Sequence, residues 1–263
     1  MNIIVFVKRV PDTREADVQI SKDGKSIETR GLVFDINDWD RYAVEEAVRL
    51  KEKLGGSVTA ITLGTTEADD ALRRCFATGV DNSIRLTDPS FEGSDPVTLA
   101  RILANSIKGI PFDMLLFGAQ AGDDGYAQVG PAVAEILGLP HASLVMKIDL
   151  QGTSIKVQRE LESGLSETLE LPLPAVLSVQ TGINEPRYVS IMGIRKASSK
   201  EIKTPKPEDL GLNSGDTGEA ASLTKVEKLF VPPVTKQTEL LSGSPDEIAV
   251  KLAQLLKDKG GIA

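Results

Sequence analysis

The chain has 263 residues, of which 41% are hydrophobic and 26% are charged, a composition that can form one large globular core and excludes a disordered chain. Its formal net charge is −8, which argues against nucleic-acid binding, because a phosphate backbone is bound mainly by a surplus of Lys and Arg. An acidic chain is better suited to small-molecule and protein partners.

The cysteine content and the N-terminus indicate the compartment. Cys75 is the single cysteine, so the chain alone forms neither a disulfide framework nor a cysteine metal cluster. The apolar run at 2–7 (NIIVFV) stops at Lys8, which is too short for a membrane span, and it lacks the basic leader and cleavage site of a secretory signal. We therefore expect a cytoplasmic protein without a membrane span, and we interpret this run as the first strand.

The first half of the chain alternates short apolar runs with patterns of helical period. A polar-alternating surface hairpin is expected around Asp23-Gly24, a pair that tolerates the positive φ angles of a tight turn. The expected strands are 2–7, 57–64, 82–88 and 112–118, and the expected helices are 37–54, 65–78 and 95–108.

This alternation predicts an α/β fold, an open and mostly parallel Rossmann-like nucleotide-binding sheet with helices on both faces. Ligands of such folds bind beyond the carboxyl ends of the strands. Function is therefore expected at 7–13, 63–66 and 118–128.

The second half changes character. Four strand patterns at 143–150, 154–161, 166–173 and 174–181 are expected to extend the sheet in antiparallel fashion. Residues 203–222 are rich in Pro, Gly and polar residues and resemble a linker, followed by an amphipathic helix at 245–260 after a Ser244 cap. We expect a nucleotide-binding domain at 1–202 and a linker with a C-terminal arm at 203–263. The arm packs either on another chain, which we favour, or back on its own domain.

The segment from Gly118 to Val129 has the composition of a phosphate site. Its glycines leave backbone N–H groups open at the start of a helix, where the helix dipole is positive. It has neither the Walker A lysine nor the spacing of a dinucleotide fingerprint. Asp123 and Asp124 would repel a phosphate, so they are expected to cap the helix or to hold a ribose hydroxyl. A tight turn without a ligand is the equally weighted alternative.

Other polar residues give weaker signals. His141, the only histidine, has no catalytic partners nearby and is interpreted as structural, so no catalytic residue is assigned. Four carboxylates, Asp38, Asp40, Glu45 and Glu46, are expected on a solvated helix surface and to bind no metal. Lys8 and Arg9 follow the first strand and either face an anion or close the strand in solvent.

Residues 180–202 suggest a docking element. Asn184, Glu185 and Pro186 form a turn signal, followed by Arg187, Tyr188 and a row of basic residues around an apolar strip. Ile183 is expected as an exposed apolar tip that contacts a partner, against the alternative of a surface loop without one.

These residues resemble the β subunit of electron transfer flavoprotein over at least 1–212. The matches are VKRV at 7–10, YAVEEAVRLKEK at 42–53, the loop at 120–131 and, most specifically, INEPRY to KEI at 183–202. The resemblance implies a heterodimer with an α subunit whose mobile domain carries FAD. It also implies a nucleotide in this subunit, AMP in the simple members and a second FAD in the electron-bifurcating ones.

The resemblance also implies site residues. Thr13 and Trp39 approach the α-subunit flavin, and Ile183, with Asn184, Glu185, Pro186, Arg187 and Tyr188, anchors an acyl-CoA dehydrogenase. Together with the strand-end argument, the expected nucleotide-binding residues are Phe6, Lys8, Asn37, Leu63, Gly64, Gly118, Gln120, Gly122, Asp123, Asp124, Gly125, Tyr126, Ala127, Gln128 and Val129.

The nucleotide in this subunit is FAD or AMP. The segments VPDT at 10–13 and AQVGP at 127–131 resemble the bifurcating members and favour FAD, whereas NEPRY resembles the simple members. Two other functions compete with electron transfer. One is an adenine-nucleotide sensor of similar topology, and the other is a nucleotide-dependent hydrolase or ligase, which the missing catalytic motifs disfavour.

Overall fold

The computed structural model describes residues 1–14, 16–213, 215–233, 238 and 240–260. The chain forms two compact units, Met1–Glu227 and Lys228–Ala263. The candidate site lies in the first unit, and the second unit is described separately below.

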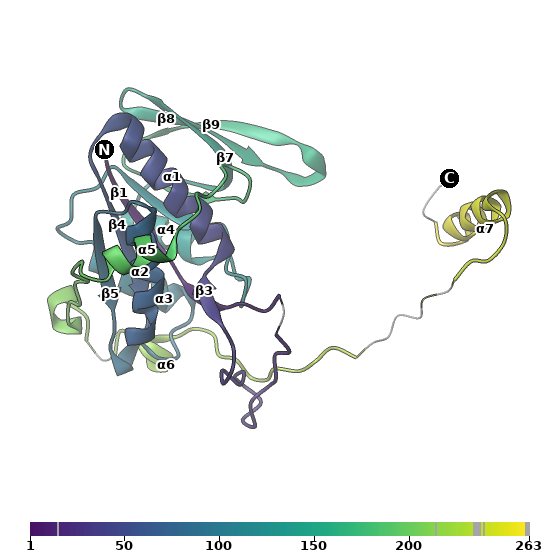
Figure 1. The fold of residues 1–263 in the computed structure, drawn as a ribbon, viewed down its shortest axis with the longest axis horizontal. Coiled ribbons are helices and arrows are strands. Elements are labelled where there is room, and N and C mark those ends of the chain that lie inside the picture. The colour runs from purple at the N-terminus through teal and green to yellow at the C-terminus, as the bar shows by residue number, and fades with distance from the viewer. Residues whose placement is uncertain (15, 214, 234–237, 239, 261–263) are drawn as a thin grey trace. The chain divides into compact units, whose positions relative to one another are not determined.

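The first unit is built on one eight-stranded sheet with the order β5-β4-β1-β6-β10-β7-β8-β9. Figure 1 shows β8 and β9 side by side at one end of this unit. The six strands from β5 to β7 in this order are parallel, and β8 and β9 add an antiparallel extension. The strands are β1 (Asn2–Phe6), β4 (Ser57–Leu63), β5 (Asn82–Leu86), β6 (Met114–Gly118), β7 (His141–Gln151), β8 (Ser154–Glu160), β9 (Ser166–Pro172) and β10 (Ala175–Val179). The mostly parallel α/β fold is confirmed.

Two details of the sheet differ from expectation. β7 and β10 do not extend the sheet in antiparallel fashion, because β10 inserts between β6 and β7 and is parallel to both. All five of its residues are buried, a pattern typical of a central parallel strand. The hairpin expected around Asp23-Gly24 is present but short: its arms form one bridge between Ile20 and Ile27, and the Ser21 N–H donates to the Ser26 carbonyl at 2.9 Å. A separate two-stranded sheet pairs β2 (Arg9–Pro11) with β3 (Phe34–Ile36).

Helices cover both faces of the sheet. Alternation along β1 places Ile3 and Val5 in one apolar cluster and Ile4 and Phe6 in another. The first cluster includes residues of α1 and α2, and the second includes residues of α3 and α4. The helices of this unit are α1 (Asp38–Leu54), α2 (Asp69–Thr78), α3 (Pro96–Ser106), α4 (Val129–Leu137), α5 (Ile191–Ala197) and α6 (Gly218–Ala221), with 3₁₀ turns at Thr66–Ala68, Pro89–Phe91, Glu162–Gly164 and Pro207–Leu210.

The segment expected to be a linker from 203 belongs to the compact unit. Lys203 bridges to Ile84 on β5, and the Arg85 N–H donates to the Lys203 carbonyl at 2.8 Å. Leu210 and Leu212 are buried in the second apolar cluster. These contacts move the boundary of the unit from 202 to Glu227, because two leucines within a Pro- and Gly-rich composition still contribute core surface.

The second unit contains α7 (Pro245–Asp258), which begins with a capping box between Ser244 and Glu247. Its apolar residues Val250 and Leu252 are 71% and 48% exposed within the chain. Residues 214, 234–237, 239 and 261–263 of the expected arm lie outside the described residues. Among the helices that the structure describes, none is both long and apolar enough to span a bilayer.

Candidate functional site

The candidate site lies where the chain reverses its direction of travel across the sheet. After β1 the chain adds β4 and β5 on one side, and α3 then carries it back to β6 on the other side of β1. The ladder between β1 and β6 ends at Val5 and Leu116, so the two strands separate beyond that point. Such a switch point opens a crevice at the carboxyl ends of the strands.

The expected strand-end residues gather at this switch point. The rings of Phe6 and Phe117 stack with centroids 4.4 Å apart and planes 12° from parallel. Phe6, Leu63 and Val129 belong to the same apolar cluster, although they come from β1, β4 and the start of α4. Gly64 follows Leu63 and donates its N–H to the Leu86 carbonyl at 3.0 Å.

The start of α1 supplies the polar side chains that bind the strand ends and the loop after β6. Asn37, the N-cap residue, makes no side-chain cap and turns to the loop after β6 instead. Its Nδ2 donates to the Gln120 carbonyl at 2.8 Å, and its Oδ1 accepts from the Gly122 N–H at 3.0 Å. Three residues of the predicted site are thereby brought together.

Asp40 makes the corresponding contacts at the strand ends. Its Oδ2 accepts from the Lys8 N–H at 2.7 Å and its Oδ1 from the Gly118 N–H at 3.1 Å. Burial raises the pKa of Asp40 to about 7, although the hydrogen bonds from the Lys8 and Gly118 amides oppose the shift. The expected solvated position of Asp40 and Glu45 is wrong, since both are buried, at 6% and 1% exposure.

The two aspartates of the loop bind Lys8. The Lys8 ammonium contacts Asp123 Oδ1 at 2.8 Å and Asp124 Oδ2 at 2.6 Å. Neither aspartate caps α4, whose N-cap is Gln128 and which has no side-chain cap. The expected capping role is therefore wrong, because α4 begins at Val129, too far along the chain from both carboxylates.

The backbone before α4 contains two left-handed residues. Gly125 and Ala127 have positive φ angles of 63° and 55°, and Gln128 is right-handed helical. The Gly125 N–H donates to the Ala121 carbonyl at 2.9 Å and the Tyr126 N–H to Asp124 Oδ1 at 3.1 Å, so the amides that suit an anion are those that follow, at the start of α4, where the first N–H groups have no partners within the helix. A left-handed conformation at a residue other than glycine is strained, as is common at binding sites. Tyr126 beside this turn is 49% exposed.

Trp39 lies between two parts of the site. Its Nε1 donates to Gln180 Oε1 at 2.8 Å, and Gln180 Nε2 donates to Glu160 at 2.8 Å. Its ring also lies beside Gly122. Thr13, the other residue expected near the α-subunit flavin, is exposed after β2.

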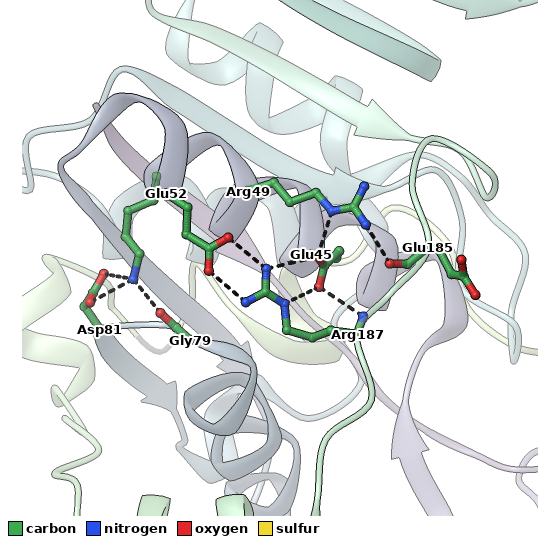
Figure 2. Close-up of polar contacts among 8 residues, drawn as sticks. Glu45, Arg49, Glu52, Gly79, Asp81, Glu185 and Arg187 are labelled. Carbon is green, nitrogen blue, oxygen red and sulfur yellow. Dashed lines mark hydrogen bonds and ion pairs between the residues drawn. The ribbon is translucent and has the colours of Figure 1, made fainter.

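The expected docking turn is fixed to α1 (Figure 2). Arg187 donates to Glu45 Oε2 through Nε at 2.9 Å and to Glu52 through both Nη atoms at 2.8 and 3.0 Å. Arg49 Nη2 donates to the Glu185 carbonyl at 2.9 Å. Asn184 Nδ2 donates to the Tyr42 carbonyl and to Glu46 Oε2, each at 3.0 Å.

Glu45, at the centre of this ion-pair cluster, is held in its ionised form by two arginines. Burial alone would raise the pKa of Glu45, but hydrogen bonds from Arg187 and Arg49 hold it below its ordinary value. The side chains of Asn184 and Arg187 therefore make their hydrogen bonds with α1 of the same chain. The exposed part of the docking segment begins after Arg187, at Tyr188.

The apolar part of the docking segment also differs from expectation. Ile183 is half-buried against the first apolar cluster, so it is not a fully exposed tip. The outward-facing side chains are Tyr188, Ile191 and Met192, which are 89%, 70% and 71% exposed.

Sequence reasoning missed Asp40, Gln180 and the pairing of Glu45. A signal for Asp40 was present, because Asp40, Val44 and Ala47 share one helical stripe and the other two are apolar. Gln180 and Glu45 have no comparable signal, since their partners lie far away in sequence.

Comparisons with known proteins agree with the resemblance. The family model for the electron transfer flavoprotein domain matches residues 25–210. The electron transfer flavoprotein subunit beta of Methylophilus methylotrophus is 36% identical, over 99% of this chain and 100% of its own. That of Thermoanaerobacterium thermosaccharolyticum is 38% identical, over 98% and 99%. The caffeyl-CoA reductase-Etf complex subunit CarD of Acetobacterium woodii is 36% identical, over 98% and 99%.

Proposed function

The chain belongs to the electron transfer flavoprotein family as a beta subunit, and from this premise we propose that it works in a heterodimer with an alpha subunit. The family performs flavin-based electron transfer. The proposed heterodimer accepts electrons from a flavin dehydrogenase and passes them to a downstream acceptor. The chain's own part is to hold a nucleotide and to present docking surfaces, with no substrate bond chemistry.

We propose that the crevice between β1 and β6 binds an adenine nucleotide. The observation that carries this proposal is the turn at Gly125–Gln128, whose positive φ angles and free helix-start amides fit a phosphate. Phe6, Leu63 and Val129 provide an apolar surface for the parts of the nucleotide other than its phosphates. A Cβ added at Gly125 would meet no atom within 4 Å, which leaves room for a ligand beside the turn.

We propose FAD rather than AMP as this nucleotide. The segments VPDT and AQVGP, which resemble bifurcating members, favour it, and the half-exposed Tyr126 ring is available for stacking. A bound flavin would supply one- or two-electron transfer, and the residues named here would bind and orient it. Electron bifurcation is proposed on the same grounds.

The proposed electron donor is an acyl-CoA dehydrogenase or a similar flavin dehydrogenase. The support is the rigid attachment of the docking turn to α1 and the exposed side chains that follow it. A preorganised segment loses little conformational freedom on binding, so a small apolar contact can be specific.

The test is to copurify the chain with its alpha subunit, release the bound nucleotides with acid and identify them by chromatography. Two FAD per heterodimer supports FAD in this subunit, and one FAD with one AMP supports the simple carrier. A heterodimer with neither nucleotide in this subunit contradicts the assignment of the crevice. A flavin-free homodimer would point to a nucleotide sensor instead.

A further inference from the structure

Asp40 holds together the two strands that separate at the switch point. Its carboxylate accepts one N–H from the end of β1 at Lys8 and one from the end of β6 at Gly118. The β1–β6 ladder has already ended at Val5 and Leu116, so these two N–H groups lie outside it. The carboxylate of Asp40 therefore joins the two strand ends at the point where their own ladder has stopped.

The neighbouring residues are arranged around this carboxylate. A Cβ at Gly118 would collide with Asp40 Oδ1 and would lie 2.7 Å from Trp39 Cβ, so glycine is required there by Asp40 and Trp39. Four residues later in the same loop, the Gly122 N–H is held by Asn37. One helical turn thus fixes both the start and the middle of the loop that leads to α4.

The contacts require the ionised form of Asp40. Both partners are N–H donors, and a carboxylate accepts from both, whereas a protonated carboxyl group presents a hydroxyl donor to one of them. Burial of such a charged group without a counter-ion in direct contact is costly, which is unusual for a purely structural residue. This cost indicates that the ionised group serves the site.

We propose that Asp40 is a positioning residue for the nucleotide site, and that its ionised carboxylate sets the spacing between the strand ends and the loop that receives the nucleotide phosphates. This inference rests on the proposed nucleotide function. Asp40 acts through the Lys8 and Gly118 backbone, whose N–H groups each donate to one of its two carboxylate oxygens.

The charged and titratable groups around Asp40 determine how it responds to pH. Lys8, on the β1 side, favours its ionised form, and the ammonium of Lys8 is in turn paired with Asp123 and Asp124 after β6. Cys75, on α2, is buried and its thiol pKa is raised well above its ordinary value, so it stays neutral. The carboxylate of Asp40 is therefore the group of this cluster that titrates near neutral pH.

The experiment compares Asp40→Asn with Asp38→Asn in the heterodimer. Both changes remove one negative charge from the first turn of α1, but the Asp38 side chain is 59% exposed and contacts no part of the crevice among the described hydrogen bonds. The measurement is the rate at which the adenine nucleotide of this subunit is lost during dialysis, from pH 5.5 to pH 8.5.

Wild type and Asp38→Asn are expected to lose nucleotide faster as the pH falls through about 7. Asp40→Asn is expected to lose it at least about tenfold faster at pH 8, as for one unpaired buried N–H, and at a rate independent of pH. Gly118→Ala, whose Cβ displaces the carboxylate, is expected to resemble Asp40→Asn.

Equal retention in Asp40→Asn and Asp38→Asn would overturn this inference and leave the nucleotide site intact. If Asp40→Asn does not fold, a flat wild-type profile between pH 6 and pH 8 would overturn it equally. A wild-type heterodimer without any adenine nucleotide in this subunit would instead overturn the proposed function, and the inference with it.

Discussion

Asp40 imposes a pH-dependent cost on folding at the scale of a single residue. The unfolded carboxyl group ionises near its ordinary pKa of 3.8, whereas the folded one stays protonated up to about 7. The folded state therefore binds more protons between these values, and the contribution of Asp40 to stability falls as the pH rises through that window. Above about pH 7 both states are ionised and the contribution is constant.

Asp40→Asn should remove this dependence. We expect the difference in unfolding free energy, variant minus wild type, to rise between pH 4 and pH 7 by up to about 4 kcal/mol, as three pKa units imply. Nucleotide-depleted heterodimer should be unfolded by urea at several pH values. A difference that is constant with pH would show that Asp40 is not perturbed by burial.

Gly125 provides a second test at residue scale. Gly125→Val should lose bound nucleotide and should cost about 1–2 kcal/mol of stability from the left-handed backbone. Gly24→Val is the matched control, because Gly24 has a φ of 68° and equally open surroundings in a distant turn. Both variants should show a similar loss of Tm without nucleotide. Full nucleotide retention in Gly125→Val would remove this turn from the site.

At the scale of elements, the docking turn depends on its attachment to α1. Arg187→Lys keeps the charge but cannot form the paired contacts with Glu45 and Glu52. We expect the free energy of unfolding to fall by about 1–3 kcal/mol, because the Glu45 carboxylate is buried. We also expect a raised KM for the dehydrogenase. Arg14→Lys, at an exposed pair with Asp12, should leave Tm and KM unchanged. An unchanged KM in Arg187→Lys would separate the ion-pair cluster from docking.

The two apolar ends of the docking segment should behave differently. Tyr188→Ala should raise the KM for the dehydrogenase without lowering Tm, because the ring is 89% exposed. Ile183→Ala should raise KM and also lower Tm by the equivalent of about 1–2 kcal/mol, since its side chain packs on the core. Flavin content should be normal in both. Normal KM values at low partner concentration in both variants would contradict the proposed docking role.

The helices and strands could be predicted from sequence where local pattern decides them. The helix expected at 37–54 lies at Asp38–Leu54, and the strand expected at 57–64 lies at Ser57–Leu63, because apolar period and glycine stops are local signals. The place of β10 could not be predicted, since a buried apolar run does not specify its neighbours. Asp40 and Glu45 were misplaced because their burial depends on partners distant in sequence.

At the scale of the whole molecule, the two compact units predict what truncation should do. Removing residues 228–263 should leave Met1–Glu227 folded, because that unit contains both apolar clusters. It should reduce heterodimer yield, since the second unit by itself does not bury the apolar side chains of α7. Circular dichroism of the truncated chain and its recovery with a tagged alpha subunit measure the two effects. Undiminished recovery would contradict a partner-binding arm.

The position of β10 has a consequence for the order of folding. β6 and β7 are consecutive strands joined through α4, yet β10, which is made later, separates them. Until β10 inserts, the strands up to β6 share no ladder with β7, β8 and β9. β10 therefore joins two parts of the sheet whose own contacts are shorter in sequence range. It also places Val179 beside Gly118 and accepts the Ala119 N–H at 2.8 Å. The switch point is therefore completed by the last strand of the sheet to be synthesised, and a nascent chain gains its nucleotide site only after residues 175–179 have been made.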